Sequence, residues 1–491
     1  MVPDSDQHTN MRLNRPSQRH ATNSHPVGLD HDNSHPVGLD SVDLDPALAG
    51  RAPWILVALL GAIIAAVALA GVSLTVGILG MIIEACFVAY FVRHLAFTTS
   101  ALHYARRDID TFSLDPGWRP SVSVLVACHN EEAVVTSLVD HLLVLDYPAD
   151  RLELMVVDDG STDKTGSMLD ELAAAHPQLK CLHRPAGAGG GKSGALNAGL
   201  EHVTGDIIVV FDADHWPRPD VIWRLARHFA DPAVGAVQGR CVIRNGAESQ
   251  LAHLVGIDYL AGYLVNEYGR QAIFTLPAYG GANCAVRASS LRAIGGWNVR
   301  SVTDDTDLTL RLLLRGERVR YDVTAIDEEE GAVALGQYWR QRYRWARGHQ
   351  QVWRDYRRAV WQTPYLTVPE KIETTMFLLA FHLPVLSTAG LVVSAFWLAG
   401  VAPPVDSANL FVLWLLLFIG PLLEFGAGLL IAARDRREIT AVAYFLPLFF
   451  LSMAICTKAW LDGILGRRYA WVKTARSAEV TRSLRSSQLA S

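Results

Sequence analysis

The chain contains little cysteine and little net charge, and each shortage excludes a class of protein. Its six cysteines are scattered over 491 residues without a CxxC pair, which fits neither a disulfide framework nor a structural zinc site. The formal net charge is only −5, so the basic excess typical of nucleic-acid binding is missing. We therefore expect a reduced, cytosolic catalytic region and no nucleic-acid partner.

Charge is also missing from a long apolar stretch near the N-terminus. Between 53 and 92 the first charged residue is Glu84. The length fits two membrane-spanning helices joined by a tight turn near Gly71 and Ser73, since each span needs roughly 20 residues. The stretch begins too late and runs too long for a cleaved signal peptide. Glu84 either faces a polar interior or lies near the interface, and both interpretations stay open. By the positive-inside rule, the flanking arginines place both ends in the cytoplasm: Arg12, Arg15, Arg19 and Arg51 before the stretch, and Arg93, Arg106 and Arg107 after it.

Residues 1–50 are polar and rich in His, Asp, Asn and Pro. The octapeptide at 23–30 recurs at 33–40. This composition is typical of a disordered tail with a recent duplication. Metal capture by the repeated histidines is the alternative, although no nearby residues would complete a closed site.

Residues 105–335 have the pattern of an α/β domain. Runs rich in Val and Ile alternate with helical stretches, which predicts a mostly parallel sheet covered on both faces. In such nucleotide-binding folds the ligand lies at the carboxyl ends of the strands, where the acidic motifs of this chain fall. The strands are expected at 121–127, 152–157 and 206–211, and the helices at 136–145 and 164–175.

Apolar sequence returns after this domain. Half of the residues in the chain are hydrophobic and the mean hydropathy is +0.18, which is high for a purely soluble protein. Residues 336–373 predict amphipathic interfacial helices. A pair of membrane helices is expected at 374–432, turning at Pro403 and Pro404, with a further membrane segment at 439–465.

Asp158 and Asp159 end one predicted strand and enter a turn containing Gly160. A carboxylate there can accept hydrogen bonds from a uracil or a ribose, while the amides of the turn face the ligand. The alternative is an ordinary strand-to-helix loop with a capping side chain.

Asp212 and Asp214 follow the apolar strand at 206–211 as an Asp-x-Asp motif. Alternate residues of an extended segment point the same way, so both carboxylates can address one site. Mg²⁺ or Mn²⁺ takes oxygen ligands and commonly bridges carboxylates to substrate phosphates. Such a metal would neutralise charge on a departing diphosphate, although the motif also occurs by chance in loops.

Two further motifs complete the set. Asp304 and Asp305 begin a helical pattern, where Asp305 either acts as a general base on an acceptor hydroxyl or caps the helix. Gln341, Arg344 and Trp345 share one helical face. The indole offers a platform for a sugar ring and the guanidinium can stabilise phosphate charge. A basic amphipathic helix at the membrane surface is the alternative, and both roles are compatible.

The segment 186–193 looks like a P-loop whose first glycine is replaced by Ala186. The preceding segment, 179–183, is a poor candidate for a buried strand, so an ATPase is disfavoured. Lys192 remains a candidate for binding a phosphate or a base in the nucleotide site.

These motifs, in this order over roughly residues 90–480, resemble the family 2 inverting glycosyltransferases. The resemblance is strongest to the membrane-embedded processive synthases of cellulose, chitin, hyaluronan and poly-N-acetylglucosamine. It implies a GT-A-like domain that uses Mg²⁺ or Mn²⁺, although the family usually has Glu at the position of Asp304. The resemblance implies Asp159 for the uridine, Asp212 and Asp214 for the metal and diphosphate, and Asp305 as the base. For the acceptor and diphosphate it implies Gln341, Arg344, Trp345, Gly281 and Asn283. With the candidates from the motifs themselves, the predicted nucleotide-binding residues are Asp158, Asp159, Lys192 and Asp212.

Residues 466–491 include a segment similar to the gating loop of that family, which lies over the nucleotide in the cytoplasm. Three full spans after a cytosolic domain would put this segment outside, whereas its basic residues favour the cytosolic side. We therefore expect 439–465 to be re-entrant, in the membrane plane, or divided into two near Pro447. The gating-loop-like residues are Trp471, Lys473, Thr474 and Arg476.

The sequence thus predicts a multi-pass enzyme of the inner or plasma membrane with a cytoplasmic catalytic domain. It would transfer hexose from a UDP-sugar to a growing polysaccharide and pass the polymer through its own helices, with accessory export proteins as further partners. One alternative keeps the chemistry but adds a single sugar to a membrane lipid. The other is a transport or sensor protein with a degenerate catalytic domain.

Overall fold

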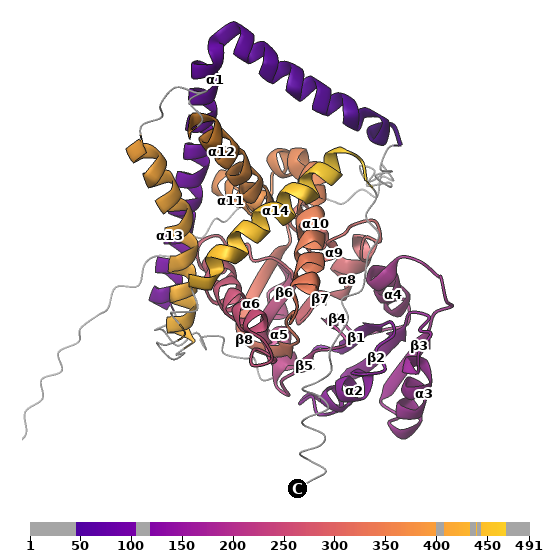
Figure 1. Cartoon of the computed structure of the whole chain (residues 1–491). Coiled ribbons are helices and arrows are strands. Elements are labelled where there is room, and N and C mark those ends of the chain that lie inside the picture. The colour runs from indigo at the N-terminus through magenta and orange to yellow at the C-terminus, as the bar shows by residue number, and fades with distance from the viewer. Residues whose placement is uncertain (1–45, 105–117, 399–406, 433–437, 439–442, 468–491) are drawn as a thin grey trace, which may run out of the picture. The chain divides into compact units, whose positions relative to one another are not determined.

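The computed structural model of the chain describes residues 46–104, 118–398, 407–432, 438 and 443–467 (Figure 1). The described residues from Leu48 onward belong to one compact unit. The tandem octapeptide and the gating-loop-like residues 471–476 lie outside the described residues. The six cysteines are all free.

The centre of the unit is an eight-stranded sheet in the order β3-β2-β1-β4-β7-β6-β8-β5. Strands β1 to β4 are parallel, β7 is antiparallel to both β4 and β6, and β6 is parallel to β8. The expected mostly parallel sheet is confirmed. The strands are β1 (Val122–Cys128), β2 (Leu152–Asp158), β3 (Leu179–His183), β4 (Ile207–Phe211), β5 (Trp216–Pro217), β6 (Val234–Ile243), β7 (Cys284–Arg287) and β8 (Arg318–Glu329).

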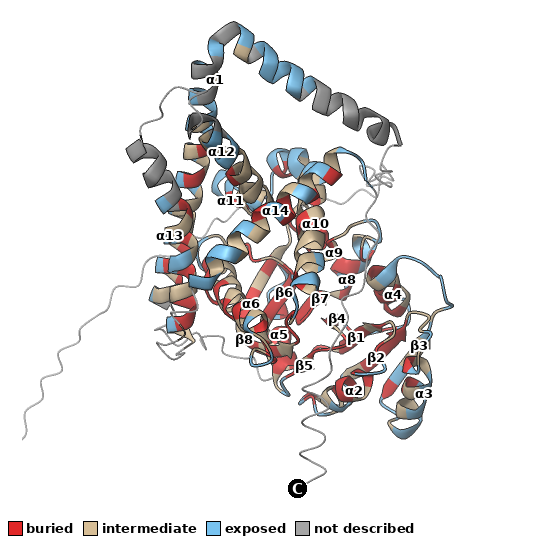
Figure 2. Cartoon of the chain, in the orientation of Figure 1, coloured by how far each residue is buried: buried red, intermediate tan, exposed pale blue. Residues whose placement is uncertain are grey.

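Both faces of this sheet are covered, because the side chains of a strand alternate between them. In β4, Val209 belongs to the core on one face and Ile208 to the core on the other. The first core includes residues of α2 (Val135–Leu143), α3 (Thr165–Ala175) and α5 (Val221–Ala226), and the second includes residues of α4 (Gly191–Leu200), α8 (Ala288–Ala293) and α9 (Asp304–Leu313). Figure 2 shows the resulting band of buried strands.

The expected N-terminal pair of membrane helices is one helical run, α1 (Pro46–Tyr104), that is broken at Gly71. Gly71 has φ 80° and ψ 158°, a conformation that interrupts a helix and favours glycine. The part from Gly77 to His103 is long and apolar enough to cross a membrane. The helix therefore continues beyond residue 92, where the apolar sequence ends. Glu84 is partly buried in it.

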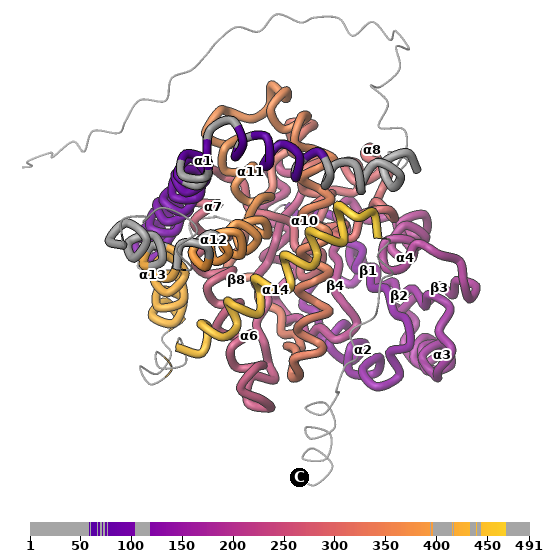
Figure 3. The backbone as a smooth tube through the Cα atoms, turned by 45° about the horizontal axis from the view of Figure 1, so that its top comes forward, coloured from indigo at the N-terminus to yellow at the C-terminus, as the bar shows by residue number. Residues whose placement is uncertain are grey.

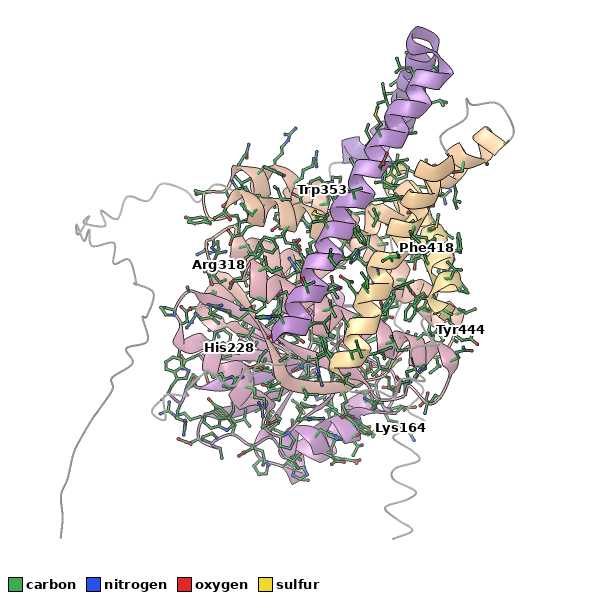
Figure 4. The ribbon with its side chains drawn as sticks, turned by 90° about the vertical axis from the view of Figure 1, so that its left-hand side faces the viewer. Lys164, His228, Arg318, Trp353, Phe418 and Tyr444 are labelled. Carbon is green, nitrogen blue, oxygen red and sulfur yellow. The ribbon has the colours of Figure 1, made fainter. Side chains whose placement is uncertain are left out.

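Five helices follow the sheet in the described part of the C-terminal half. They are α10 (Leu335–Gln362), α11 (Val368–Leu379), α12 (Leu383–Leu398), α13 (Ser407–Ile431) and α14 (Phe445–Ile464). Val368–Val392 and Phe445–Ile464 are also apolar and long enough to span a membrane. Figure 4 shows Phe418 of α13 and Tyr444 before α14 among these helices, while Lys164, before α3, lies at the opposite end.

The last of these helices, α14, is continuous from Phe445 to Ile464, so the expected division near Pro447 is not found there. Pro447 lies in the first turn, where the missing amide would have no intrahelical partner. The helix crosses α10 and passes beside α12 (Figure 3). Its depth in the membrane stays a prediction.

Shorter helices connect β6 to β7 and strand ends elsewhere. Between β6 and β7 the chain forms α6 (Gln250–Ala261), a π-helical turn η2 (Gly262–Glu267) and α7 (Tyr268–Ile273). The turns η1 (Arg227–Ala230) and η3 (Ala380–His382) extend α5 and α11. None of these elements was anticipated from the sequence.

Candidate active site

Asp158 and Asp159 lie at the carboxyl end of β2 and have different surroundings. Asp158 is buried, and its carboxylate accepts a hydrogen bond from the Ser161 amide at 3.1 Å and lies 3.0 Å from Nδ1 of His183. Asp159 forms an ion pair with Arg184. Asp158 thus holds the turn in shape, while Asp159 stands at its surface. The sequence analysis did not identify Arg184 as the partner of Asp159, because it considered the following segment only for its likeness to a P-loop.

Asp212 and Asp214 sit where β4 ends, beside His215. Their ligand atoms and those of His215 lie within 4.8 Å of one another. Asp214 is fully buried, and its carboxylate accepts a hydrogen bond from the Glu330 amide at 3.4 Å. The side chain of Asp212 is 31% exposed. One carboxylate is therefore held by the residue that follows β8, and the other is partly exposed.

His215 lies between two carboxylates of β8, those of Asp327 and Glu329. Its Nδ1 contacts Asp327 and its Nε2 lies 3.2 Å from Glu329. Burial alone would lower the pKa of the imidazole, but these two carboxylates raise it well above its usual value. The two carboxylates of β8 thus favour the protonated form of His215.

Two carboxylates that converge at one strand end suit a divalent metal. Carboxylate oxygens are the ligands that Mg²⁺ and Mn²⁺ prefer, and Asp212 and Asp214 offer them from one turn. The residues present therefore fit the expected cation. His215 belongs to the same cluster, and the two aspartates predicted from the sequence stay the predicted metal ligands.

Lys192 and Ser193 connect the Asp-x-Asp motif to the helix that carries Asp305. Lys192 Nζ lies 2.5 Å from Asp212 and donates to the Gly281 carbonyl at 2.8 Å. Ser193 donates to the Asp304 carboxylate at 2.9 Å. Burial opposes the charge on Lys192, yet Asp212 and Asp304 raise the pKa of its ammonium group. The P-loop-like segment is thus part of the site, because it begins α4 between the two acidic motifs.

Asp305 is in the first turn of α9, next to Asp304. Thr306 donates its amide to the Asp305 carboxylate at 2.6 Å. Burial, followed by the like charge of Asp304, raises the pKa of Asp305 to about 6. A carboxylate with such a pKa accepts protons more readily than an ordinary aspartate, which suits a general base at neutral pH.

Gly281 and Asn283 shape the wall of the site opposite Asp305. Gly281 has φ +78°, and a Cβ added there would lie 3.2 Å from Cβ of Asp305. The Asn283 side chain is fully buried and donates to the carbonyls of Arg240 at 3.0 Å and Ala325 at 2.9 Å. These hydrogen bonds connect β6 to β8 through the Asn283 side chain. Because the side-chain amide is already used in them, an acceptor molecule would have to contact other atoms of this loop.

Gln341, Arg344 and Trp345 are on α10, and all three are partly buried. Arg344 lies close enough to Asp305 to lower the pKa of that carboxyl in part, against burial and Asp304. The Trp345 ring is covered by the Arg342 guanidinium at 4.5 Å, and Arg342 also pairs with Asp258 of α6. The structure therefore brings Arg344 near Asp305 from a different helix, α10.

This geometry is accompanied by similarity to known proteins. Residues 120–348 match the protein family described as glycosyltransferase like family 2. This part of the chain is therefore similar to the family 2 glycosyltransferases. The matched region covers the sheet and every acidic motif as far as α10.

The fold similarity is to a solved mannosyltransferase, PcManGT from Pyrobaculum calidifontis, in complex with GDP-Man and Mn²⁺. The TM-score is 0.52 at 25% sequence identity, and the match covers 77% of this chain and 99% of that one. The expected GT-A-like fold is confirmed by this similarity.

Curated relatives include two named enzymes of different kinds. The chain is 41% identical over 267 residues to a beta-monoglucosyldiacylglycerol synthase of Synechocystis sp., covering 54% of this chain and 55% of that protein. It is 26% identical over 269 residues to a poly-beta-1,6-N-acetyl-D-glucosamine synthase of Staphylococcus aureus, covering 54% and 62%. It is also 36% identical over 245 residues to the probable glycosyltransferase YdaM of Bacillus subtilis, covering 48% and 58%. The chain thus spans little more than half the length of these relatives.

Proposed function

We propose that the protein is a membrane-bound inverting glycosyltransferase that adds one hexose from a UDP-sugar to a diacylglycerol-type lipid. The observation that carries this proposal is the 41% identity to a beta-monoglucosyldiacylglycerol synthase, against 26% to a polysaccharide synthase. It favours the single-transfer alternative over the polymerase that the motifs suggested. Glucose is accordingly the expected sugar.

Donor binding would use the carboxyl ends of β2 and β4. Asp159 and Arg184 stand where a uridine can be recognised by hydrogen bonds, and Asp158 keeps that turn in shape. Asp212 and Asp214 would hold Mg²⁺ or Mn²⁺, which supplies positive charge to the diphosphate. Lys192 adds a fixed cation beside Asp212.

Transfer would depend on Asp305 as the base. Its carboxylate removes the proton from the acceptor hydroxyl, and the oxygen forms a bond to the anomeric carbon of the sugar. The bond from that carbon to the diphosphate oxygen breaks, and UDP leaves with the electron pair. Arg344 stands near Asp305 and can stabilise the departing charge. A single displacement of this kind inverts the configuration.

A lipid acceptor is consistent with the position of α10. This helix carries the Gln341, Arg344 and Trp345 motif and also packs against α14 and α11, which are among the apolar helices. Arg347, one turn beyond the motif, donates to the Ala459 carbonyl of α14 at 3.2 Å. The hydroxyl of an acceptor lipid at the membrane surface would therefore lie near Asp305.

The test uses full-length protein purified in detergent and reconstituted with dioleoylglycerol. A panel of UDP-sugars is supplied with Mg²⁺ or Mn²⁺, and UDP release and lipid-extractable product are measured together. We expect UDP-glucose to give one glycolipid band. Asp305→Asn should abolish transfer while UDP binding persists, and Glu171→Gln, at an exposed position of α3, should leave turnover unchanged.

Two outcomes would contradict the proposal. Product that stays in the aqueous phase as a size ladder would identify a polymerase, as first expected. Lipid glucosylation that survives in Asp305→Asn would remove the base assignment while leaving the acceptor class intact.

A further inference from the structure

Helices α12 and α14 line an open groove of about 610 Å³. This volume lies within the range of roughly 300–1,000 Å³ that is typical of small-molecule sites. Most of its lining is apolar, and several lining side chains remain 38–45% exposed, among them Leu391, Phe450 and Leu461. It lies apart from Asp305 and the Asp-x-Asp motif, whose residues do not line it.

One end of the groove is charged. Asp462 is buried. One of its carboxylate oxygens forms an ion pair with Lys458, and the other lies 3.0 Å from the Arg467 guanidinium. The side chains of Lys458 and Arg467 are 50% and 66% exposed, so both cations still face outward. Each therefore retains donors for a further anionic partner.

A third cation belongs to the same end. Arg347 of α10 donates to the carbonyls of Ala459 and Arg467, at 3.2 and 3.0 Å, and so places its charge on this part of α14. Tyr343, from the same helix, donates to Asp462 at 2.7 Å. These residues supply three cations against one carboxylate, which leaves a formal excess of two positive charges.

An apolar groove with an excess of positive charge at one end matches the shape of a charged lipid. Helix α14 and the helical run Val368–Val392, which ends within α12, are apolar and long enough to cross a membrane. In a membrane, acyl chains are the apolar molecules that would surround them. Neutral diacylglycerol offers no charge to the cations, whereas a phosphate does. We propose that this groove binds an anionic phospholipid, with one acyl chain between α12 and α14 and the phosphate on Lys458 and Arg467.

The experiment measures lipid binding directly and needs no catalytic activity. Delipidated full-length protein in a neutral detergent is titrated with dioleoylphosphatidylglycerol, dioleoylphosphatidylcholine, dioleoylglycerol or inorganic phosphate, and bound lipid is counted by native mass spectrometry. We expect phosphatidylglycerol to bind roughly thirtyfold more tightly than phosphatidylcholine, because each cation near an anionic headgroup contributes about fivefold. Equal affinity for the two phospholipids would overturn the proposal.

Variants separate the two halves of the site. Lys458→Gln combined with Arg467→Gln should remove the preference for phosphatidylglycerol, whereas Arg354→Gln, an exposed cation elsewhere on α10, should keep it. Ala454→Trp fills the groove and should weaken the binding of both phospholipids to the same extent. Retained preference in the double variant would contradict the headgroup assignment, and unchanged binding in Ala454→Trp would contradict the chain assignment.

The remaining arms distinguish other occupants. Inorganic phosphate should not compete with phosphatidylglycerol, and competition would indicate a soluble anion site instead. Dioleoylglycerol should not compete either, and displacement by it would assign the groove to the acceptor lipid. Each of these results would replace the proposal rather than extend it.

Discussion

At the scale of single residues, the site depends on like charges held close together. Asp304 and Asp305 are neighbours at the start of α9. The Asp304 carboxylate accepts a hydrogen bond from the Ser193 hydroxyl, and the Asp305 carboxylate accepts one from the Thr306 amide. The helix amides stabilise both charges, and burial opposes them. The pair thereby sets the basicity of Asp305.

This pairing predicts the pH dependence of transfer. Asp305 must be ionised to accept a proton, so kcat/KM should rise with pH through the pKa of about 6. Asp304→Asn removes the like charge but keeps an acceptor for Ser193, so the acidic limb should move to lower pH. Profiles of kcat/KM against pH for the two proteins would show the shift. An unmoved limb in Asp304→Asn would disprove the coupling.

Lys192 gives a second prediction at this scale. Because it contacts both Asp212 and the Gly281 carbonyl, Lys192→Gln should lower kcat/KM for the UDP-sugar about 10- to 100-fold, the range expected for a lost charged hydrogen bond. Lys180→Gln, at an exposed ion pair on β3, is the matched control. Equal kinetics in both variants would exclude Lys192 from the donor site.

At the scale of elements, α10 fixes the position of α9. Gly348 of α10 is buried, and a Cβ added there would lie 2.2 Å from Cγ2 of Thr303, the residue before α9. Close contact between the two helices thus places Asp305 relative to Arg344. Glycine is needed here for the approach and not for its conformation.

Gly348→Ala should therefore push α9 away from α10. Overpacking costs about 1–3 kcal/mol, and we expect a fall in kcat that exceeds the change in donor KM. Gly336→Ala on the same helix, where the nearest atom to the added Cβ is 3.6 Å away, should leave both constants unchanged. Steady-state kinetics on the two proteins provide the comparison, and equal kcat values would disprove the contact argument.

Local sequence predicted the elements whose residues determine their own structure. The Val- and Ile-rich strands β1, β2 and β4 were expected within one residue of their observed bounds, because their burial on both faces is visible as apolar runs. Helices α6 and α7 were not predicted. The apolar residues of α6 are spread around the helix and do not form the one-sided stripe that indicates an amphipathic helix.

The acidic motifs were predicted at strand ends, but their partners were not. Glu329 and Asp327 reach His215 only because β8 pairs with β6 and β5, a contact between segments more than a hundred residues apart in the chain. No local pattern encodes such a pairing. The same holds for Ser193 and Asp304, which come together from α4 and α9.

At the scale of the whole molecule, a buried carboxylate joins the apolar helices to the α/β domain. Glu373 of α11 accepts from Arg93 of α1 at 2.8 and 2.9 Å and from Arg270 of α7 at 3.1 Å. All three side chains are nearly inaccessible. Three elements from distant parts of the chain therefore meet at one ion cluster.

Loss of this carboxylate should destabilise the protein as a whole. Glu373→Gln removes the carboxylate paired with the buried Arg93 and leaves Arg270, among the described residues, with only Glu267, at 3.6 Å. Breaking such a buried pair costs about 3–5 kcal/mol. Thermal unfolding in one detergent should show a clearly lowered Tm, while Glu171→Gln at the exposed surface of α3 should not. An unchanged Tm would mean that the cluster does not couple the two parts.

The central claim, a single inverting transfer to a lipid, is tested most directly by the chemical structure of the product. Protein supplied with UDP-glucose and dioleoylglycerol would be analysed by intact mass and by NMR of the anomeric proton. We predict one hexose per lipid in the β configuration, opposite to that of the donor. A series of masses separated by one hexose, or an α-linked product, would contradict it.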